Sequence, residues 1–95
     1  MANRDPTAAL TLAARAWQAW TQGHVASAQA FARAATVAVR QGPRRERQQV
    51  QVVALAVIGD LDRASGLAAE HLAEFPGDEL IRQIQAWVAG RRRGI

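Results

Sequence analysis

The side chains that could perform chemistry in this sequence are few and far apart. The chain has two histidines, His24 and His71, and no cysteine, which excludes a Cys-based zinc site and a cysteine nucleophile. The histidines share no carboxylate at ligand spacing, so we expect no metal. The only serines, Ser27 and Ser65, have no base nearby. With no phosphate-binding glycine loop and no Gly-x-Ser-x-Gly motif, the sequence predicts a non-enzyme without cofactor or small-molecule substrate.

The carboxylates fit structural roles better than catalytic ones. Asp78 and Arg82 are one helical turn apart, so we expect an ordinary solvated ion pair. Asp60 and Asp62 follow a glycine where a helix should begin, and the helix dipole favours negative charge there. We expect His24, next to a turn, to be exposed to solvent.

Arginine supplies all of the positive charge. The chain has 12 arginines, no lysine and 22 alanines, and its formal net charge is +4. Codon bias in a GC-rich genome explains this composition better than a general phosphate-binding surface does. Two basic clusters remain as candidates for nucleic-acid binding: Arg40, Arg44, Arg45 and Arg47, and the tail Arg91, Arg92 and Arg93. No aromatic residue interleaves them and no helix-turn-helix spacing is clear, so nucleic-acid binding is the alternative rather than the main expectation.

The length of the chain and its apolar segments predict one soluble domain. Its 95 residues suit a single domain. The first residues lack the apolar core of a signal peptide. The longest apolar stretch, residues 52–58, is far shorter than the ~18 residues of a membrane span. We therefore expect a cytoplasmic protein with no membrane association.

Apolar periodicity and punctuation predict an all-α fold of five helices. The expected helices span about 6–22, 24–41, 44–58, 61–74 and 79–92, separated by glycine- or proline-containing turns. Asp5 and Pro6 should cap the first helix and Asp60 the fourth. Because the connections are short, neighbouring helices must pack antiparallel.

An internal repeat becomes visible when the sequence is shifted by 36 residues. The shift places Gly23 on Gly59, Ala28 on Ala64 and Ala32 on Ala68. Each copy is then a helix, a tight glycine turn and a second helix, with small residues where the helices would approach closely. A period of this size with two helices indicates an array of helical hairpins.

The second copy resembles the tetratricopeptide repeat. Gly59-Asp60-Leu61-Asp62-Arg63-Ala64 opens its second helix, and Ala64-x-x-x-Ala68 and Pro76 fall in register with that family's pattern. The family's Leu-Gly pair is replaced by Arg15-Ala16 and Gln51-Val52, and His71 stands where the family usually has alanine. The segments 43–50, 54–55, 59–61 and 71–78 are also similar to bacterial relatives of tetratricopeptide repeat protein 38, a resemblance that covers about residues 8–84. The implied organisation is one domain: repeat one over 6–41, repeat two over 44–75 and a capping helix over 79–92.

The resemblance implies a non-catalytic protein-interaction module. If the hairpins stack as in that family, the first helix of each pair lines an inner face that would bind a peptide or a partner helix. The candidate contact residues are Leu10, Ala13, Trp17, Trp20, Gln49 and Val53. Two alternatives stay open. Trp17 and Trp20 could instead fill the core, with Trp87 packing from the capping helix, or the uncovered first helix could form a homodimer.

Overall fold

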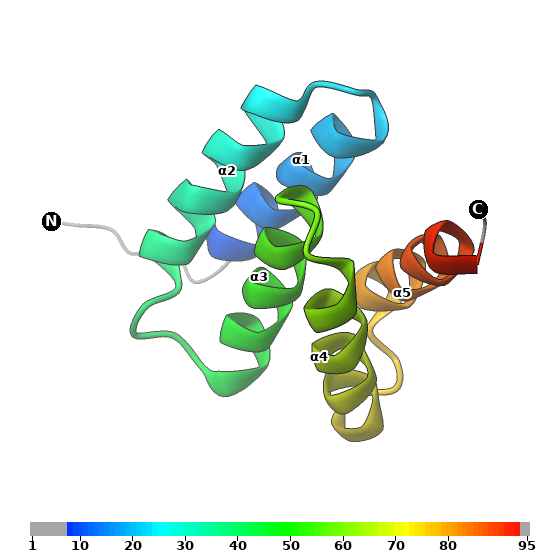
Figure 1. Ribbon diagram of the computed structural model, residues 1–95. Coiled ribbons are helices and arrows are strands. Elements are labelled where there is room, and N and C mark those ends of the chain that lie inside the picture. Colours follow the sequence, from blue (N-terminus) through cyan, green and yellow to red (C-terminus); the bar gives the residue numbers. More distant parts are fainter. Residues whose placement is uncertain (1–7, 94–95) are drawn as a thin grey trace, which may run out of the picture.

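The computed structural model describes residues 8–93, which fold into five α-helices (Figure 1). The helices are α1 (Ala8–Thr21), α2 (Val25–Ala38), α3 (Arg44–Val57), α4 (Leu61–Glu74) and α5 (Glu79–Arg93). No strand occurs in this part of the chain, so the expectation of an all-α fold is confirmed. Consecutive helices run in opposite directions (Figure 1).

The helix boundaries follow the predicted ones closely, with one clear exception. Helix α4 has the predicted bounds, and α3 and α5 differ by a residue at one end. Helix α2 ends at Ala38, three residues early, because the chain turns before Gly42, whose N–H donates to Val39 O at 2.8 Å. The predicted cap at Asp5 and Pro6 lies outside the described residues.

The two glycine turns have the same geometry. Gly23 and Gly59 have φ values of 85° and 84°, a left-handed conformation that glycine adopts without steric cost. In each turn the glycine N–H donates to a carbonyl three residues back, Trp20 O at 3.0 Å and Ala56 O at 3.1 Å. The next N–H donates to a carbonyl five residues back, at 2.9 Å for His24 and 3.0 Å for Asp60. Both turns are therefore Schellman motifs. They match at the 36-residue shift found in the sequence.

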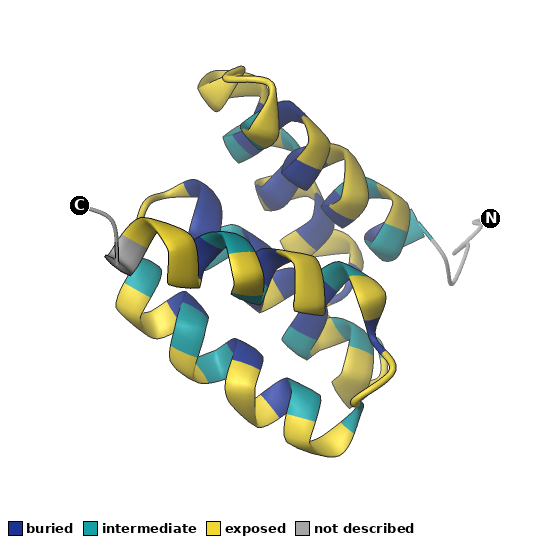
Figure 2. Ribbon diagram, turned by 90° about the vertical axis from the view of Figure 1, so that its right-hand side faces the viewer, coloured by how far each residue is buried: buried dark blue, intermediate teal, exposed yellow. Residues whose placement is uncertain are grey.

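The core lies between the helices and is built largely from small residues (Figure 2). Ala28, Ala32, Ala64 and Ala68, the alanines paired by the repeat, are all buried. Without bulky side chains there, α1 and α2, and likewise α3 and α4, approach closely.

Helix α3 contacts each of the other four helices. Beyond the packing, a hydrogen bond from Gln29 Nε2 to Val57 O at 3.0 Å joins α2 to the end of α3. An exposed ion pair between Arg44 and Glu74, at 3.1 Å, joins the start of α3 to the end of α4. The positions of the remaining helices are thus set largely by α3.

A pair of glycine substitutions tests the importance of the turn geometry. A Cβ at Gly59 would meet no atom within 4 Å, so Gly59→Ala changes only the backbone strain. We expect a loss of about 1–2 kcal/mol in the free energy of unfolding. Gly66→Ala, also without neighbours but inside α4, should gain about 0.5–1 kcal/mol. Urea denaturation measures both, and equal stability of the two variants would contradict the role of the turn.

Candidate functional site

Most of the predicted contact residues lie inside the protein. Ala13, Trp17, Gln49 and Val53 are buried, with exposed fractions between 0% and 7%, whereas Leu10 and Trp20 are only partly buried. The interpretation of the first four as an open contact face is therefore corrected. The face of α1 that carries Ala13 and Trp17, and the face of α3 that carries Gln49 and Val53, are covered by neighbouring helices.

The three tryptophans form one cluster between α1 and α5. Trp17 and Trp20 each meet Trp87 edge-to-face, with ring centroids 5.4 and 5.8 Å apart. This is a favourable arrangement for aromatic rings. The alternative in which Trp87 packs from the last helix against Trp17 and Trp20 agrees with these contacts, and the burial of Trp17 supports a core role for that residue.

A hollow of about 380 Å³ adjoins the tryptophan cluster. It is lined by Trp20, Thr21, Val25, Gly59, Leu61, Trp87 and Arg91. The Arg91 guanidinium lies 4.8 Å from the centroid of the Trp87 ring, as in a cation–π pair. Trp20 Nε1 is buried and has no hydrogen-bond partner. Trp20 thus packs on the core with one part of its ring and borders this hollow.

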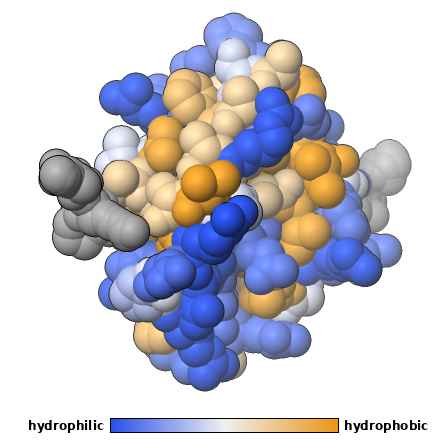
Figure 3. Space-filling model, turned by 90° about the vertical axis from the view of Figure 1, so that its left-hand side faces the viewer, coloured by the Kyte–Doolittle hydropathy of each residue, from blue (hydrophilic) through white to orange (hydrophobic). Residues whose placement is uncertain are grey.

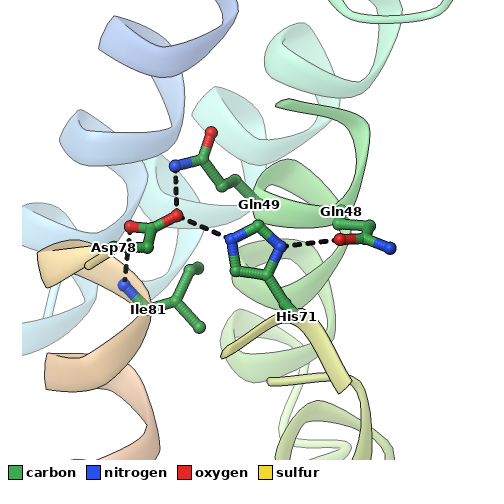
Figure 4. A network of polar contacts seen from close by, with 5 residues as sticks. All are labelled: Gln48, Gln49, His71, Asp78 and Ile81. Atoms are coloured by element: carbon green, nitrogen blue, oxygen red, sulfur yellow. Dashed lines mark hydrogen bonds and ion pairs between the residues drawn. The ribbon is translucent and has the colours of Figure 1, made fainter. Parts of the chain in front are cut away.

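A buried polar network connects α3, α4 and the turn before α5 (Figure 4). Asp78 Oδ2 lies 2.7 Å from His71 Nε2 and also accepts a hydrogen bond from Gln49 Nε2. The other His71 ring nitrogen, Nδ1, lies 2.8 Å from Gln48 Oε1. His71 is 0% exposed and Asp78 is 4% exposed. The predicted solvated pair of Asp78 with Arg82 was wrong, because Arg82 pairs with Glu79 instead.

Asp78 also caps α5. Its second oxygen, Oδ1, accepts from the Ile81 N–H at 3.3 Å, and its backbone carbonyl accepts from the Arg82 N–H at 3.0 Å. A carboxylate at this position satisfies a free N–H of the first helical turn and interacts favourably with the helix dipole. Asp78 therefore caps the beginning of α5 and also anchors this helix to α3 and α4.

The sequence contained a signal for this network that is visible only in retrospect. An Asp after Pro76-Gly77 indicates a helix N-cap, and His71 is an unexpected histidine in the repeat pattern. Neither feature shows by itself that the two side chains meet. Asp78 lies in the turn before α5 and His71 in the last turn of α4, and the rotation of α4 decides whether His71 points toward Asp78 or toward solvent.

The His71–Asp78 pair is arranged for structure. Its hydrogen-bond partners are amide groups and a backbone N–H, and both side chains are shielded from solvent. Among residues 8–93, no group of three His, Cys, Asp or Glu side chains could hold a metal ion. The His24 side chain is exposed, as expected.

The two arginine clusters lie at different ends of the fold (Figure 1). The first surrounds the turn between α2 and α3, and the second lies in the last turn of α5. In the first, Arg44 pairs with Glu74, and the Arg45 guanidinium lies 5.7 Å from the centroid of the Phe75 ring. The backbone places Arg92 and Arg93 in α5, but their side chains are not among those described. The fold does not bring the clusters together into one basic surface.

A second hollow lies between α2 and α3 on the opposite side of α3 from the buried network residue Gln49. It has a volume of about 420 Å³, and we call it the α2–α3 groove. Its lining residues are Thr36, Val39, Arg40, Arg47, Val50, Gln51, Ala54, Leu55 and Ile58. Figure 3 shows apolar atoms gathered on the face of the molecule that α2 and α3 form, bordered by hydrophilic side chains.

One large apolar side chain of the groove is well exposed: Ile58, at 64%. Helix α4 packs on α3 and α5, and none of its residues lines the groove. This side of α3 therefore keeps apolar surface that no described helix covers.

Comparisons with known proteins give no relative for this chain: no family model, no curated protein and no solved structure matches it. Within the described part of the chain, none of the helices has the length and apolar character needed to cross a membrane.

The buried carboxylate can be tested by removing it. Asp78→Ala leaves His71 and Gln49 without their common acceptor and removes the cap of α5. We expect a loss of about 3–5 kcal/mol in the free energy of unfolding, because each buried polar group left without a partner costs about 1–3 kcal/mol and a lost helix cap about 1 kcal/mol. Arg82→Ala is the control, because its exposed side chain should contribute less than about 0.5 kcal/mol. Chemical denaturation followed by circular dichroism measures both values, and similar small losses would contradict the anchoring role.

Proposed function

We propose that this protein is a non-catalytic protein-interaction module of the tetratricopeptide-like type, and that it binds its partner in the α2–α3 groove. The observation that carries the proposal is the uncovered apolar wall of α3. Ala54 and Leu55 are only partly buried there, and Ile58 is largely exposed. A small protein that exposes apolar side chains in a concave site can gain binding energy by covering them.

The repeat assignment rests on local geometry. The two Schellman turns match at the 36-residue shift, and the paired alanines are buried at equivalent places. The packing order also fits a stacked pair of hairpins, since α3 packs against both helices of the first hairpin. In such arrays, stability comes from interfaces between neighbouring units, and the stacked units form a concave surface that is used for binding.

The groove replaces the inner face of α1 as the proposed contact surface. Four of the six candidate contact residues on α1 and α3 are buried, so a partner could reach them only if the helices separated. In the groove, by contrast, apolar side chains are already accessible. Nucleic-acid binding is not favoured, because the arginine clusters are separated and Arg44, Arg45 and Arg91 already contact Glu74, Phe75 and Trp87.

A peptide-display selection against the folded protein tests this function. Selected peptides should bind Ile58→Asp at least about tenfold more weakly than the wild type, because a carboxylate in the apolar wall would lose its water on binding. Val25→Asp is the matched control. Val25 is 46% exposed and belongs to the hollow at the tryptophan cluster, so this variant should bind like the wild type.

Two outcomes would overturn the proposal. One is a selection that yields no enriched peptide. The other is binding that Val25→Asp weakens and Ile58→Asp leaves unchanged, which would move the site to the tryptophan hollow. Circular dichroism of both variants confirms that they are folded.

A further inference from the structure

We propose that the occupant of the α2–α3 groove is an amphipathic helix of a partner protein, with acidic residues in its first turn facing Arg40 and Arg47. The inference rests on the proposed function and names the chemistry of the partner. It is carried by three properties of the groove: the charge at its rim, the polar groups of its walls and its length.

The charge of the groove has one sign. Arg40 and Arg47 are exposed and line it, and no carboxylate does. Within residues 8–93 the structure gives neither arginine an ion pair, whereas Arg44, also in the turn region, is paired with Glu74. Two cations beside an apolar surface, in a protein of net charge +4, select a partner with carboxylates at matching positions.

The walls of the groove favour a helix over an extended peptide. An extended peptide needs hydrogen bonds for its backbone, usually from a sheet edge, and the described chain has no strand. Among the lining side chains, the Thr36 hydroxyl already donates to Ala32 O at 2.9 Å, which leaves Gln51 as the main uncharged polar group. A helix satisfies its own backbone and can place an apolar stripe against Leu55 and Ile58.

The order of residues along α3 sets the direction in which the partner helix lies in the groove and the length of that helix. Arg47, Gln51, Leu55 and Ile58 follow one side of the helix, from the charged end of the groove to its apolar end. The distance from Arg47 to Ile58 is about 16 Å at 1.5 Å per residue, which corresponds to roughly three helical turns. Acidic residues stabilise a helix when they lie in its first turn. The partner helix is therefore expected to place its N-terminal turn at the arginines and its apolar stripe toward Ile58.

Three synthetic peptides of about 15 residues test the proposal. All carry the same leucine stripe at helical spacing. The first has three glutamates in its first turn, the second has the glutamates in its last turn, and the third has lysines in place of the glutamates. We expect the first peptide to bind about tenfold more tightly than the second and to lose affinity as salt is raised, with little binding of the third. Fluorescence anisotropy with each labelled peptide measures the dissociation constants.

Charge-reversal variants locate the binding site. The double variant Arg40→Glu/Arg47→Glu should bind the first peptide at least about tenfold more weakly than the wild type does, and it should bind the third peptide more tightly. Arg15→Glu/Arg33→Glu makes the same change in net charge at exposed positions outside the groove, so its affinity for the first peptide should stay within about threefold of the wild type.

The outcomes separate this inference from the proposed function. Display-selected peptides that need Ile58 but carry no acidic preference would overturn the acidic helix and leave the interaction module standing. If the two double variants weakened binding of the first peptide equally, the inference of an acidic helix would also be overturned, because the effect would then come from net charge alone. Sedimentation of the wild type that shows a dimer, lost in Ile58→Asp, would assign the groove to a second copy of this chain.

Discussion

The arrangement of the second half of the molecule depends on the polar contacts of the Asp78 carboxylate. Placing a charged group where water is excluded costs several kcal/mol unless hydrogen bonds replace the lost hydration. Here the replacements come from three different helices: Gln49 on α3, His71 on α4 and the Ile81 N–H on α5. All three must be in place together. The carboxylate therefore restricts how these helices can shift or rotate. An apolar contact between them would restrict these movements less.

Helix α5 is held at two places by two different kinds of contact. At its beginning, Asp78 supplies hydrogen bonds with narrow limits on distance and angle. In its second half, Trp87 packs edge-to-face against Trp17 and Trp20 of α1. The polar contact fixes the orientation of α5, and the aromatic contacts bury apolar surface area. Together they hold α5 against α3 and against the tryptophans of α1, and this covers part of the surface that the sequence suggested as a binding face.

The sequence reveals the helices and turns well because these depend on local signals. Gly23 and Gly59 are the residues that a left-handed turn requires, and Ala28 and Ala64 are small because two helices meet there. The binding surface was harder to predict. Trp17 and Gln49 share a face with other candidate residues in each helix, but whether that face is open depends on where α5 lies. That position is set by Asp78 and His71, which come from different elements and show no periodicity that would connect them.

The same geometry explains why the open surface lies where it does. Helix α3 has four helical neighbours, and three of its contacts are reinforced by polar groups: Gln29 from α2, His71 from α4 and Asp78 before α5. These contacts hold the neighbours along the buried faces of α3 and leave its remaining side, from Arg47 to Ile58, without a cover. Since the groove forms on a helix fixed from several directions, its apolar wall and its two arginines are positioned before any partner arrives. A preformed site loses less conformational entropy on binding than one that must be ordered by its partner. The buried carboxylate, although it contacts no ligand, therefore contributes to recognition by keeping α3 in place.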